Sequence, residues 1–244
     1  MTKKELGYGN KYDKILLLEK KGFNIPKFYI YSDKEKYKIN LQFPLILRSS
    51  FSGEDGDKYS FAGIFHSYYP INSKKDLKSI IKNKKLCPDG KKLDIYKPKE
   101  LASANIIHNY IIQEFIVGDI SGVIFSKYEK KYIRIEFIPG LNFPLTDGIV
   151  SPNIYLFDRN NFDNFIIDDI YIENFSFFLN NEGKILKKYI IIDYESKFME
   201  IKNNLLKMTL DIEKIFGYPQ DIEFTVKNND IYILQTRNIT TNGK

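Results

Sequence analysis

The sequence predicts an α+β fold, with helices near its two ends and strands between them. Residues 11–22 and 196–216 carry apolar side chains at the three- and four-residue spacing of an amphipathic helix. Residues 109–137 contain short runs of β-branched and aromatic residues, which are typical of strands. Residues 221–237 form two further runs of this kind around a polar turn, and therefore predict a hairpin.

Length and composition limit the class of protein. With 244 residues, 43% of them hydrophobic, the chain can bury the core of one large domain or of two small ones. It contains no apolar run long enough for a membrane-spanning helix. Its one cysteine, Cys87, excludes an internal disulfide and a thiolate metal cluster. The polar start, residues 1–5, lacks an apolar signal core, so we expect a cytoplasmic protein.

The net charge of +6 comes almost entirely from lysines spread along the chain. Such a pattern indicates a solvated surface rather than a nucleic-acid groove. Arginine is rare, and a chain that uses lysine so freely is expected to keep arginine where a bidentate fork is needed. The four arginines are Arg48, Arg134, Arg159 and Arg237.

The N-terminal half begins with a helix of about three turns, which is expected to open near residues 9–11 and to stop at Gly22. Short strands follow, the second of which delivers Arg48 at its C-terminal end. The elements after the helix are strands at 28–31 and 44–47, a polar loop at 49–57, a strand-like run to Tyr69, and a lysine-rich stretch at 73–105 with weak helical periodicity.

The C-terminal half is predicted to hold three successive strands, a fourth strand and a long helix. A charged turn at 129–131 joins the second and third strands as a hairpin. The expected elements are strands at 110–116, 122–125, 132–137 and 189–192, and a helix at 196–216 that Gly217 ends.

The register of the last hairpin decides which side chains share a face. A three-residue loop at 228–230 places Glu223 opposite Gln235 and Asp221 opposite Arg237. Two oxygen ligands and one ion pair then lie on the same face. The other face is expected to be filled by Ile222, Phe224, Val226, Tyr232 and Leu234. A two-residue loop of Asn228 and Asn229 is the rival register, and it would separate Glu223 from Gln235.

Several common chemistries lack their motifs. There is no Walker-type phosphate loop, no dinucleotide-binding G-x-G-x-x-G and no G-x-S-x-G nucleophile elbow. The two histidines, His66 and His108, are too few for a histidine-rich metal site.

Isolated polar residues remain at the ends of apolar elements, and each alone would be ordinary surface. Arg237 could simply form a salt bridge with Asp221. Together they supply the cations that a triphosphate needs and the oxygen ligands that Mg²⁺ prefers. These residues are Lys11, Arg48, Glu223, Gln235 and Arg237.

Four motifs in order resemble one family, that of phosphoenolpyruvate synthase, pyruvate phosphate dikinase and rifampin phosphotransferase. Residues 48–63 are similar to its R-S-S-x-x-x-E-D-x-x-x-x-S-F-A-G signature. Gln113 with residues 121–125 resembles V-Q-x-M-V followed by S-G-V-M-F. Residues 219–223 and 233–240 are similar to P-Q-D-I-E-W and L-Q-x-R-P-I-T.

The resemblance implies an ATP-grasp nucleotide-binding domain built from two α+β subdomains. Residues 1–108 and 109–244 would form these subdomains, with mainly antiparallel sheets flanked by helices and a nucleotide cleft between them. The implied ligands are ATP and Mg²⁺.

The same resemblance implies a role for each matching residue, with Arg48 and Arg237 as the catalytic pair. Lys11 and Arg48 would contact phosphates, and Gly63 and Ser67 would lie in the phosphate-covering loop. Gln113 would begin the strand and hinge where adenine stacks. Glu223 and Gln235 would ligate Mg²⁺, and Arg237 would contact the terminal phosphates.

The chain departs from the family pattern at several points. Asn10 stands where the family has a second glycine before the lysine, and His66 replaces an acidic residue. The family's G-L-G-E segment reads Gly140-Leu141-Asn142-Phe143 and so loses an acid. The domain is also shorter than usual around residues 70–110. No G-G-x-x-x-H sequence, the usual setting of the transferring histidine, occurs in the 244 residues.

These features lead to one expected function and two alternatives. The expected function is a Mg-ATP-binding phosphotransferase of the dikinase type, which donates a phosphoryl or diphosphoryl group to a histidine on a separate swivelling domain or protein. A small-molecule acceptor then receives the phosphate, and ATP ends as AMP. The alternatives are a catalytically degenerate ATP-binding regulatory or assembly module, and an anionic-polymer binder that uses the lysines.

Overall fold

The computed structural model divides the chain into two compact units. One unit comprises Met1–Leu17 and Pro26–Phe115, and the other comprises Leu18–Ile25 and Ile116–Lys244. The structure describes residues 10–31, 40–51, 55–56, 59–60, 67–82, 108–170, 175–189 and 193–239.

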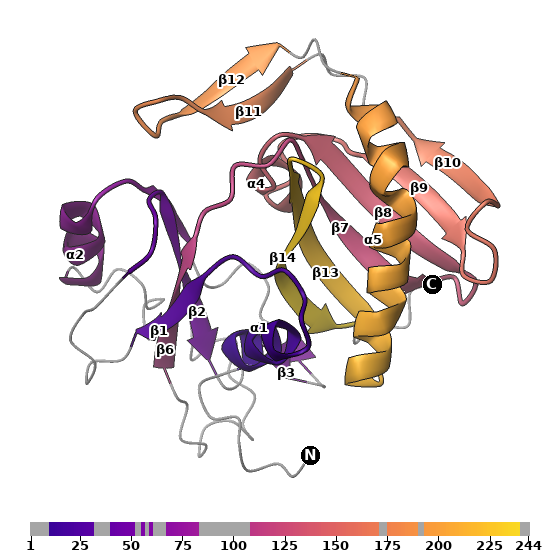
Figure 1. The fold of residues 1–244 in the computed structure, drawn as a ribbon, viewed down its shortest axis with the longest axis horizontal. Helices are drawn as coiled ribbons and strands as arrows, with labels where there is room; N and C mark the ends of the chain where they lie inside the picture. Colours follow the sequence, from indigo (N-terminus) through magenta and orange to yellow (C-terminus); the bar gives the residue numbers. More distant parts are fainter. Residues whose placement is uncertain are drawn as a thin grey trace. The chain divides into compact units, whose positions relative to one another are not determined.

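The first unit is built on a four-stranded antiparallel sheet in the order β1-β6-β2-β5 (Figure 1). Strand β6 pairs with both β1 and β2, so this unit extends to Phe115, beyond the boundary expected between residues 108 and 109. The strands are β1 (Phe28–Tyr31), β2 (Leu45–Phe51), β5 (Tyr68–Ile71) and β6 (His108–Glu114), with a small two-stranded sheet of β3 (Asp55–Gly56) and β4 (Tyr59–Ser60). The helices are α2 (Lys74–Lys82) and the part of α1 (Asn10–Lys20) up to Leu17.

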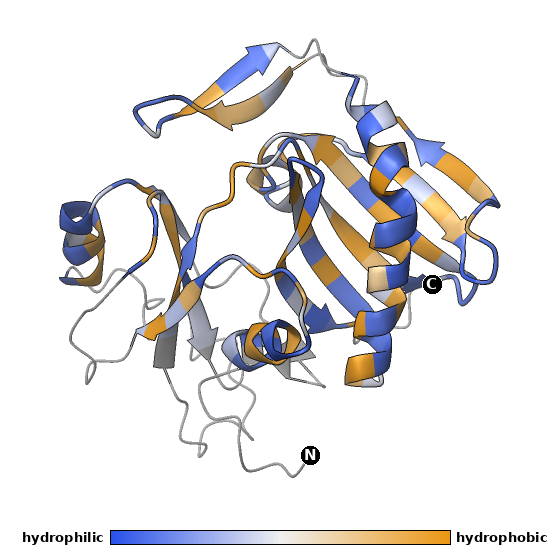
Figure 2. Ribbon diagram, in the orientation of Figure 1, coloured by the Kyte–Doolittle hydropathy of each residue, from blue (hydrophilic) through white to orange (hydrophobic). Residues whose placement is uncertain are grey.

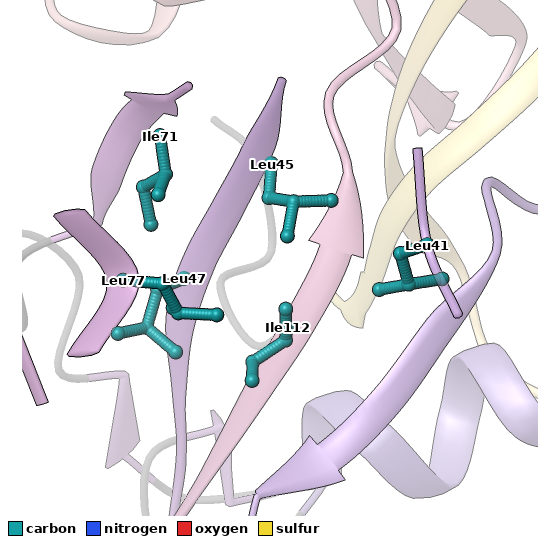
Figure 3. Packing of buried hydrophobic residues seen from close by; sticks show 6 residues of the cluster. All are labelled: Leu41, Leu45, Leu47, Ile71, Leu77 and Ile112. Carbon is teal, nitrogen blue, oxygen red and sulfur yellow. The ribbon is translucent and has the colours of Figure 1, made fainter. Parts of the chain in front are cut away.

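One face of this sheet carries a hydrophobic cluster that includes α2 (Figure 3). Leu77 is the residue that α2 buries, and it is 2% exposed. The four lysines of α2 are exposed, as a solvated surface requires, and they are Lys74, Lys75, Lys78 and Lys82. The cluster consists of Leu41, Leu45, Leu47, Ile71, Leu77 and Ile112.

The second unit is built on a six-stranded antiparallel sheet in the order β10-β9-β8-β7-β13-β14. The long helix α5 (Tyr194–Phe216) lies across one of its faces (Figure 1). The strands are β7 (Ile120–Tyr128), β8 (Tyr132–Pro139), β9 (Asn153–Asp158), β10 (Phe165–Asp169), β13 (Gln220–Lys227) and β14 (Asp230–Asn238).

The core of this unit lies between α5 and the sheet. Phe198 of α5 is fully buried and stacks on Phe137 of β8, with ring centroids 3.9 Å apart. The ring centroid of Phe198 also lies 5.3 Å from that of Tyr155 of β9. Figure 2 shows hydrophobic and hydrophilic residues alternating along the strands, and this alternation leaves the opposite face polar.

Both ends of α5 follow ordinary capping rules. The Asp193 side chain accepts a hydrogen bond from the Ser196 amide at 3.0 Å, which caps the N-terminus. Gly217 ends the helix in the left-handed region with φ +74°, and its amide donates to the Glu213 carbonyl. The predicted helix therefore gains two residues at its start and ends where expected.

Arg159 fastens α5 to the sheet. Its two terminal nitrogens donate to the two carboxylate oxygens of Glu213, at 3.0 and 2.7 Å. Burial alone would raise the pKa of Glu213, but hydrogen bonds from Arg159 and Ser126 outweigh it and lower that pKa. At this position the two parallel hydrogen bonds of an arginine therefore hold a helix in place and do not bind a ligand.

The segment after β8 that contains Gly140 and Leu141 is held by another hairpin. This hairpin consists of β11 (Phe175–Leu179) and β12 (Ile185–Tyr189). The Leu141 amide donates to the Phe177 carbonyl at 3.1 Å. Gly140 has φ +82°, and a Cβ there would lie 2.6 Å from the same carbonyl oxygen, so only glycine fits. This contact fixes the start of α4 (Phe143–Thr146).

Most predicted elements are confirmed, but β3, β4, β9, β10, β11 and α4 were not predicted. The polar loop expected at 49–57 is wrong in part, because β2 extends to Phe51 and β3 comprises Asp55–Gly56. The strand predicted at 189–192 overlaps β12 only at Tyr189, where β12 ends, and residues 190–192 lie outside the described residues. Of the lysine-rich stretch 73–105, the described part forms α2. Among the described helices, none combines the length and apolar character needed to cross a membrane.

Candidate functional site

The polar face of the six-stranded sheet gathers the predicted residues of the second unit. Glu223 on β13 pairs with Gln235 on β14, as the sequence predicted. On its other side, Glu223 pairs with Val123 of β7, which in turn pairs with Glu136 of β8. Paired residues share a face of the sheet, so the two glutamates and the glutamine lie on the face opposite α5.

The turn of the hairpin combines both registers considered from the sequence. Lys227 pairs with Asp230, so the loop has two residues, Asn228 and Asn229, with φ of +52° and +68°. A β-bulge beside Glu223 then shifts the register, because Phe224 pairs with Ile233 while Glu223 pairs with Gln235. The rival loop is therefore correct, and its expected consequence, the separation of Glu223 from Gln235, is wrong.

The bulge also changes which apolar residues fill the buried face. Ile222 and Phe224 pair with Thr236 and Ile233, so these four lie on the side of α5. Tyr232 pairs with Thr225 and lies on the polar side, against the sequence expectation.

Asp221 and Arg237 form the ion pair that the register predicted. Arg237 Nε donates to Asp221 Oδ2 at 2.6 Å. Burial raises the pKa of Asp221 to about 6, although Arg237 acts against the shift, and Glu223 and Glu136 add to it by repulsion. The carboxylate thus holds the guanidinium at the edge of the same polar face.

The raised pKa predicts a pH dependence of stability that requires Asp221. A carboxyl group that binds its proton more tightly in the folded chain loses stability as pH rises through the interval between its two pKa values. The contribution of Asp221 to the stability of the wild type should therefore fall between about pH 4 and pH 6. The variant Asp221→Asn lacks this loss. The difference between its free energy of unfolding and that of the wild type should therefore rise by up to about 3 kcal/mol from pH 4 to pH 6.

Urea unfolding at both ends of the interval measures this difference. The control is Asp211→Asn, at an exposed carboxylate of α5, which should keep the wild-type pH dependence. Parallel wild-type and Asp221→Asn curves would refute the assigned titration.

Arg134 and Glu136 extend the polar face along β8. Arg134 Nε donates to Glu136 Oε1 at 2.7 Å, and a terminal nitrogen lies 3.5 Å from Asp168 Oδ2. In the sequence, Arg134 stands out only as a rare arginine, and Glu136 is not among the predicted site residues. Polar residues alternating with apolar ones along residues 132–137 were the available signal.

Asn142 reaches the same face from the loop before α4. Its Nδ2 lies 3.5 Å from Glu223 Oε2, while its Oδ1 is buried and has no hydrogen-bond partner among the described residues. Carboxylate and amide oxygens are the ligands that Mg²⁺ prefers. The side chains of Glu223, Gln235 and Asn142 therefore fit a divalent cation, although the described residues include no cluster of three histidine, cysteine or acidic residues suited to a metal.

In the first unit, the start of α1 lies against the end of β2. The Tyr12 amide donates to Ser50 Oγ at 3.2 Å, and the Tyr12 ring contacts Phe28 at 5.5 Å. This bond places Lys11, which precedes Tyr12, in the same unit as Arg48, which lies two residues before Ser50 on β2. Arg48 is half-buried.

Three other residues were predicted for the site, namely Gln113, Ser67 and Gly63. Gln113 does not begin a strand, since β6 starts earlier and ends at Glu114. It is 1% exposed, and its Nε2 has no hydrogen-bond partner within the described ranges. Ser67 is exposed just before β5. Gly63 lies outside the described residues.

Comparison with known proteins places this geometry in context. Residues 28–244 match the family described as pyruvate phosphate dikinase, AMP/ATP-binding domain. The chain is 29% identical to an uncharacterized phosphotransferase, YvkC, of Bacillus subtilis over 84% of its length, and spans 25% of that protein. It is 28% identical to a probable phosphoenolpyruvate synthase of Archaeoglobus fulgidus, covering 80% of this chain and 27% of the synthase. Rifampicin phosphotransferase of Bacillus cereus is also 28% identical, with 80% and 23% covered.

The chain thus spans about a quarter of the length of these relatives. Its fold class is the expected α+β class, with antiparallel sheets and helices. The family match covers most of the chain. The protein therefore belongs to the pyruvate phosphate dikinase AMP/ATP-binding domain family.

Proposed function

We propose that this chain is the Mg-ATP-binding component of a dikinase-type phosphotransferase. It donates a phosphoryl or diphosphoryl group from ATP to a histidine on a separate swivelling domain or protein, which passes phosphate to a small-molecule acceptor. The observation that carries the proposal is the pairing of Glu223 with Gln235 beside the ion-paired Arg237, in a family named for AMP and ATP binding. The named relatives are phosphotransferases and a probable phosphoenolpyruvate synthase.

Each residue has a definite task in this proposal. Glu223 and Gln235 hold Mg²⁺, which supplies neutralisation of the phosphate charge when bound. Arg237, oriented by Asp221, donates to the terminal phosphate oxygens. Lys11 and Arg48 bind phosphates from the first unit, and Ser67, together with Gly63, covers them.

Arginine is better suited than lysine to the two catalytic positions. A guanidinium donates two parallel hydrogen bonds to a phosphate, whereas an ammonium acts as a point charge. Arg48 and Arg237 thus stabilise the charge that spreads over the transferred group, and the protein contributes position and charge rather than covalent chemistry.

Gln113 is proposed to contact the adenine ring. Its buried amide nitrogen needs an acceptor, and none lies within hydrogen-bond distance among the described residues. A ring nitrogen of the base would provide one, at the end of β6 where the chain leaves the first sheet.

Transfer of label from ATP tests the proposed function. The full chain is incubated with Mg²⁺, ATP labelled in its β- and γ-phosphates, and a protein that carries a phosphohistidine domain. We expect AMP to form and label to appear on the histidine of the partner. Formation of ADP alone, or AMP without label on the partner, would contradict the dikinase-type reaction.

A regulatory or assembly module that binds ATP without turnover is the second candidate. The replacement of the family's G-L-G-E by Gly140-Leu141-Asn142-Phe143 favours it, because an acid is lost at Phe143, the residue after Asn142, whose Nδ2 lies 3.5 Å from Glu223 Oε2. Calorimetry separates the two. Tight ATP binding with neither hydrolysis nor transfer, with or without the partner, supports this candidate.

A further inference from the structure

Asn142 occupies the N-cap position of α4 but does not cap the helix with its side chain. Asparagine is a preferred N-cap residue because its side-chain oxygen accepts a backbone N–H of the first turn. Here no such hydrogen bond forms. The backbone carbonyl of Asn142 accepts the amides of Leu145 and Thr146 instead, at 3.1 and 3.2 Å. The Asn142 side chain therefore makes its contact outside the helix.

That side chain is directed toward Glu223. Its Nδ2 lies 3.5 Å from Glu223 Oε2, which is a long contact, so this hydrogen bond alone explains little of the orientation. Its Oδ1 is buried and accepts nothing from the described residues. A buried acceptor of this kind normally has a donor, an ordered water or an ion beside it.

The surroundings favour an ion. The one side-chain group in printed contact with the Asn142 amide is the Glu223 carboxylate, which offers acceptors and no donor. Gln235, across the strand from Glu223, adds another carbonyl oxygen. A hard cation satisfies a carboxylate and two amide oxygens together, and it also relieves the repulsion between them.

We propose that Asn142 Oδ1 is the third protein oxygen of the divalent-cation site formed by Glu223 and Gln235. The inference rests on the proposed function, because it requires that pair to hold the cation. It also accounts for the altered loop. The acid of the family pattern falls at Phe143, whose ring packs on Phe177 at 5.5 Å, and the oxygen donor is supplied one residue earlier.

Binding of Mn²⁺ in the presence of a non-hydrolysable ATP analogue tests the inference without an activity assay. Free Mn²⁺ is measured by electron paramagnetic resonance for the full chain and for three variants, Asn142→Leu, Asn142→Asp and Glu223→Gln. We expect Asn142→Leu to bind Mn²⁺ about 10-fold more weakly. Asn142→Asp keeps the oxygen and adds charge, so it should bind at least as tightly as wild type.

The aspartate variant separates ligation from simple positioning. It loses the donor to Glu223 and gains a like charge beside it, so a role limited to that hydrogen bond predicts weaker binding. Weaker Mn²⁺ binding by Asn142→Asp would therefore overturn the inference. Thermal unfolding checks that each variant folds, and Asn142→Ala replaces the leucine variant if that one does not.

The glutamine variant separates the inference from the proposed function. If Glu223→Gln loses affinity while Asn142→Leu binds like wild type, the inference fails and the cation role of Glu223 stands. If Glu223→Gln binds Mn²⁺ like wild type, the metal role in the proposed function and the inference fail together.

Discussion

Replacing Glu223 by glutamine is expected to lower AMP formation by more than about 100-fold. Glu223 carries the only negative charge in the cross-strand pair with Gln235, and the glutamine variant keeps the size of the side chain while removing that charge. The cation would then be held by neutral oxygens, which bind Mg²⁺ weakly. Single-turnover assays with the histidine-domain partner measure the loss.

The matched control is Glu182→Gln, at an exposed carboxylate in the turn between β11 and β12. It makes the same chemical change away from the polar face and should leave AMP formation unchanged. Equal rates for Glu223→Gln and wild type would exclude the proposed metal role, provided that both proteins remain folded.

Replacing Phe198 by alanine is expected to destabilise the second unit by about 4 kcal/mol. The ring is fully buried against Phe137 and Tyr155, and its removal leaves a cavity between α5 and the sheet. Chemical denaturation, monitored by the loss of β-sheet structure, measures this change in the free energy of unfolding. Cation binding by the folded fraction should be unaffected, because Phe198 and Glu223 lie on opposite faces of the sheet.

Phe198→Leu serves as the control because it keeps most of the buried volume, and it should cost less than about 1.5 kcal/mol. Equal destabilisation by the two variants would indicate that the cavity is not the cause. A loss below about 1 kcal/mol for the alanine variant would contradict the packing described for α5.

The strands next to the last hairpin could be predicted from the sequence because their side chains alternate or form short apolar runs. Strand β9 was missed although it is central, since Asn153 at its start and Asp158 at its end are polar. Both are buried, so tertiary contacts rather than local pattern decide their environment. β10 was missed because its apolar run contains exposed isoleucines at 166 and 167 on an edge strand.

The predicted pairing of Glu223 with Gln235 is confirmed, but the turn that was expected to produce it is wrong. A bulge adds one residue to a strand, and no local pattern in residues 230–238 distinguishes it from a longer loop. Arg159 shows a different limit. Its rarity suggested a bidentate contact, which it makes with Glu213, but only the fold reveals which arginine has which partner.

Glu136 and Asn142 could not be predicted as neighbours of Glu223 because their proximity depends on strand order and on the loop held by Phe177. Both are distant from Glu223 in sequence. The family resemblance marked the loop at 140–143 only as a departure, and the position of Asn142 beside Glu223 comes from the structure.

The most direct test of the central claim is a crystal structure of the full chain with Mn²⁺ and a non-hydrolysable ATP analogue, in which anomalous scattering locates the cation. We predict a Mn²⁺ peak about 2.1 Å from a Glu223 carboxylate oxygen and from Gln235 Oε1, with the phosphates of the analogue beside Arg237. A cation bound by phosphates alone, with Glu223 and Gln235 out of contact with it, would contradict the account.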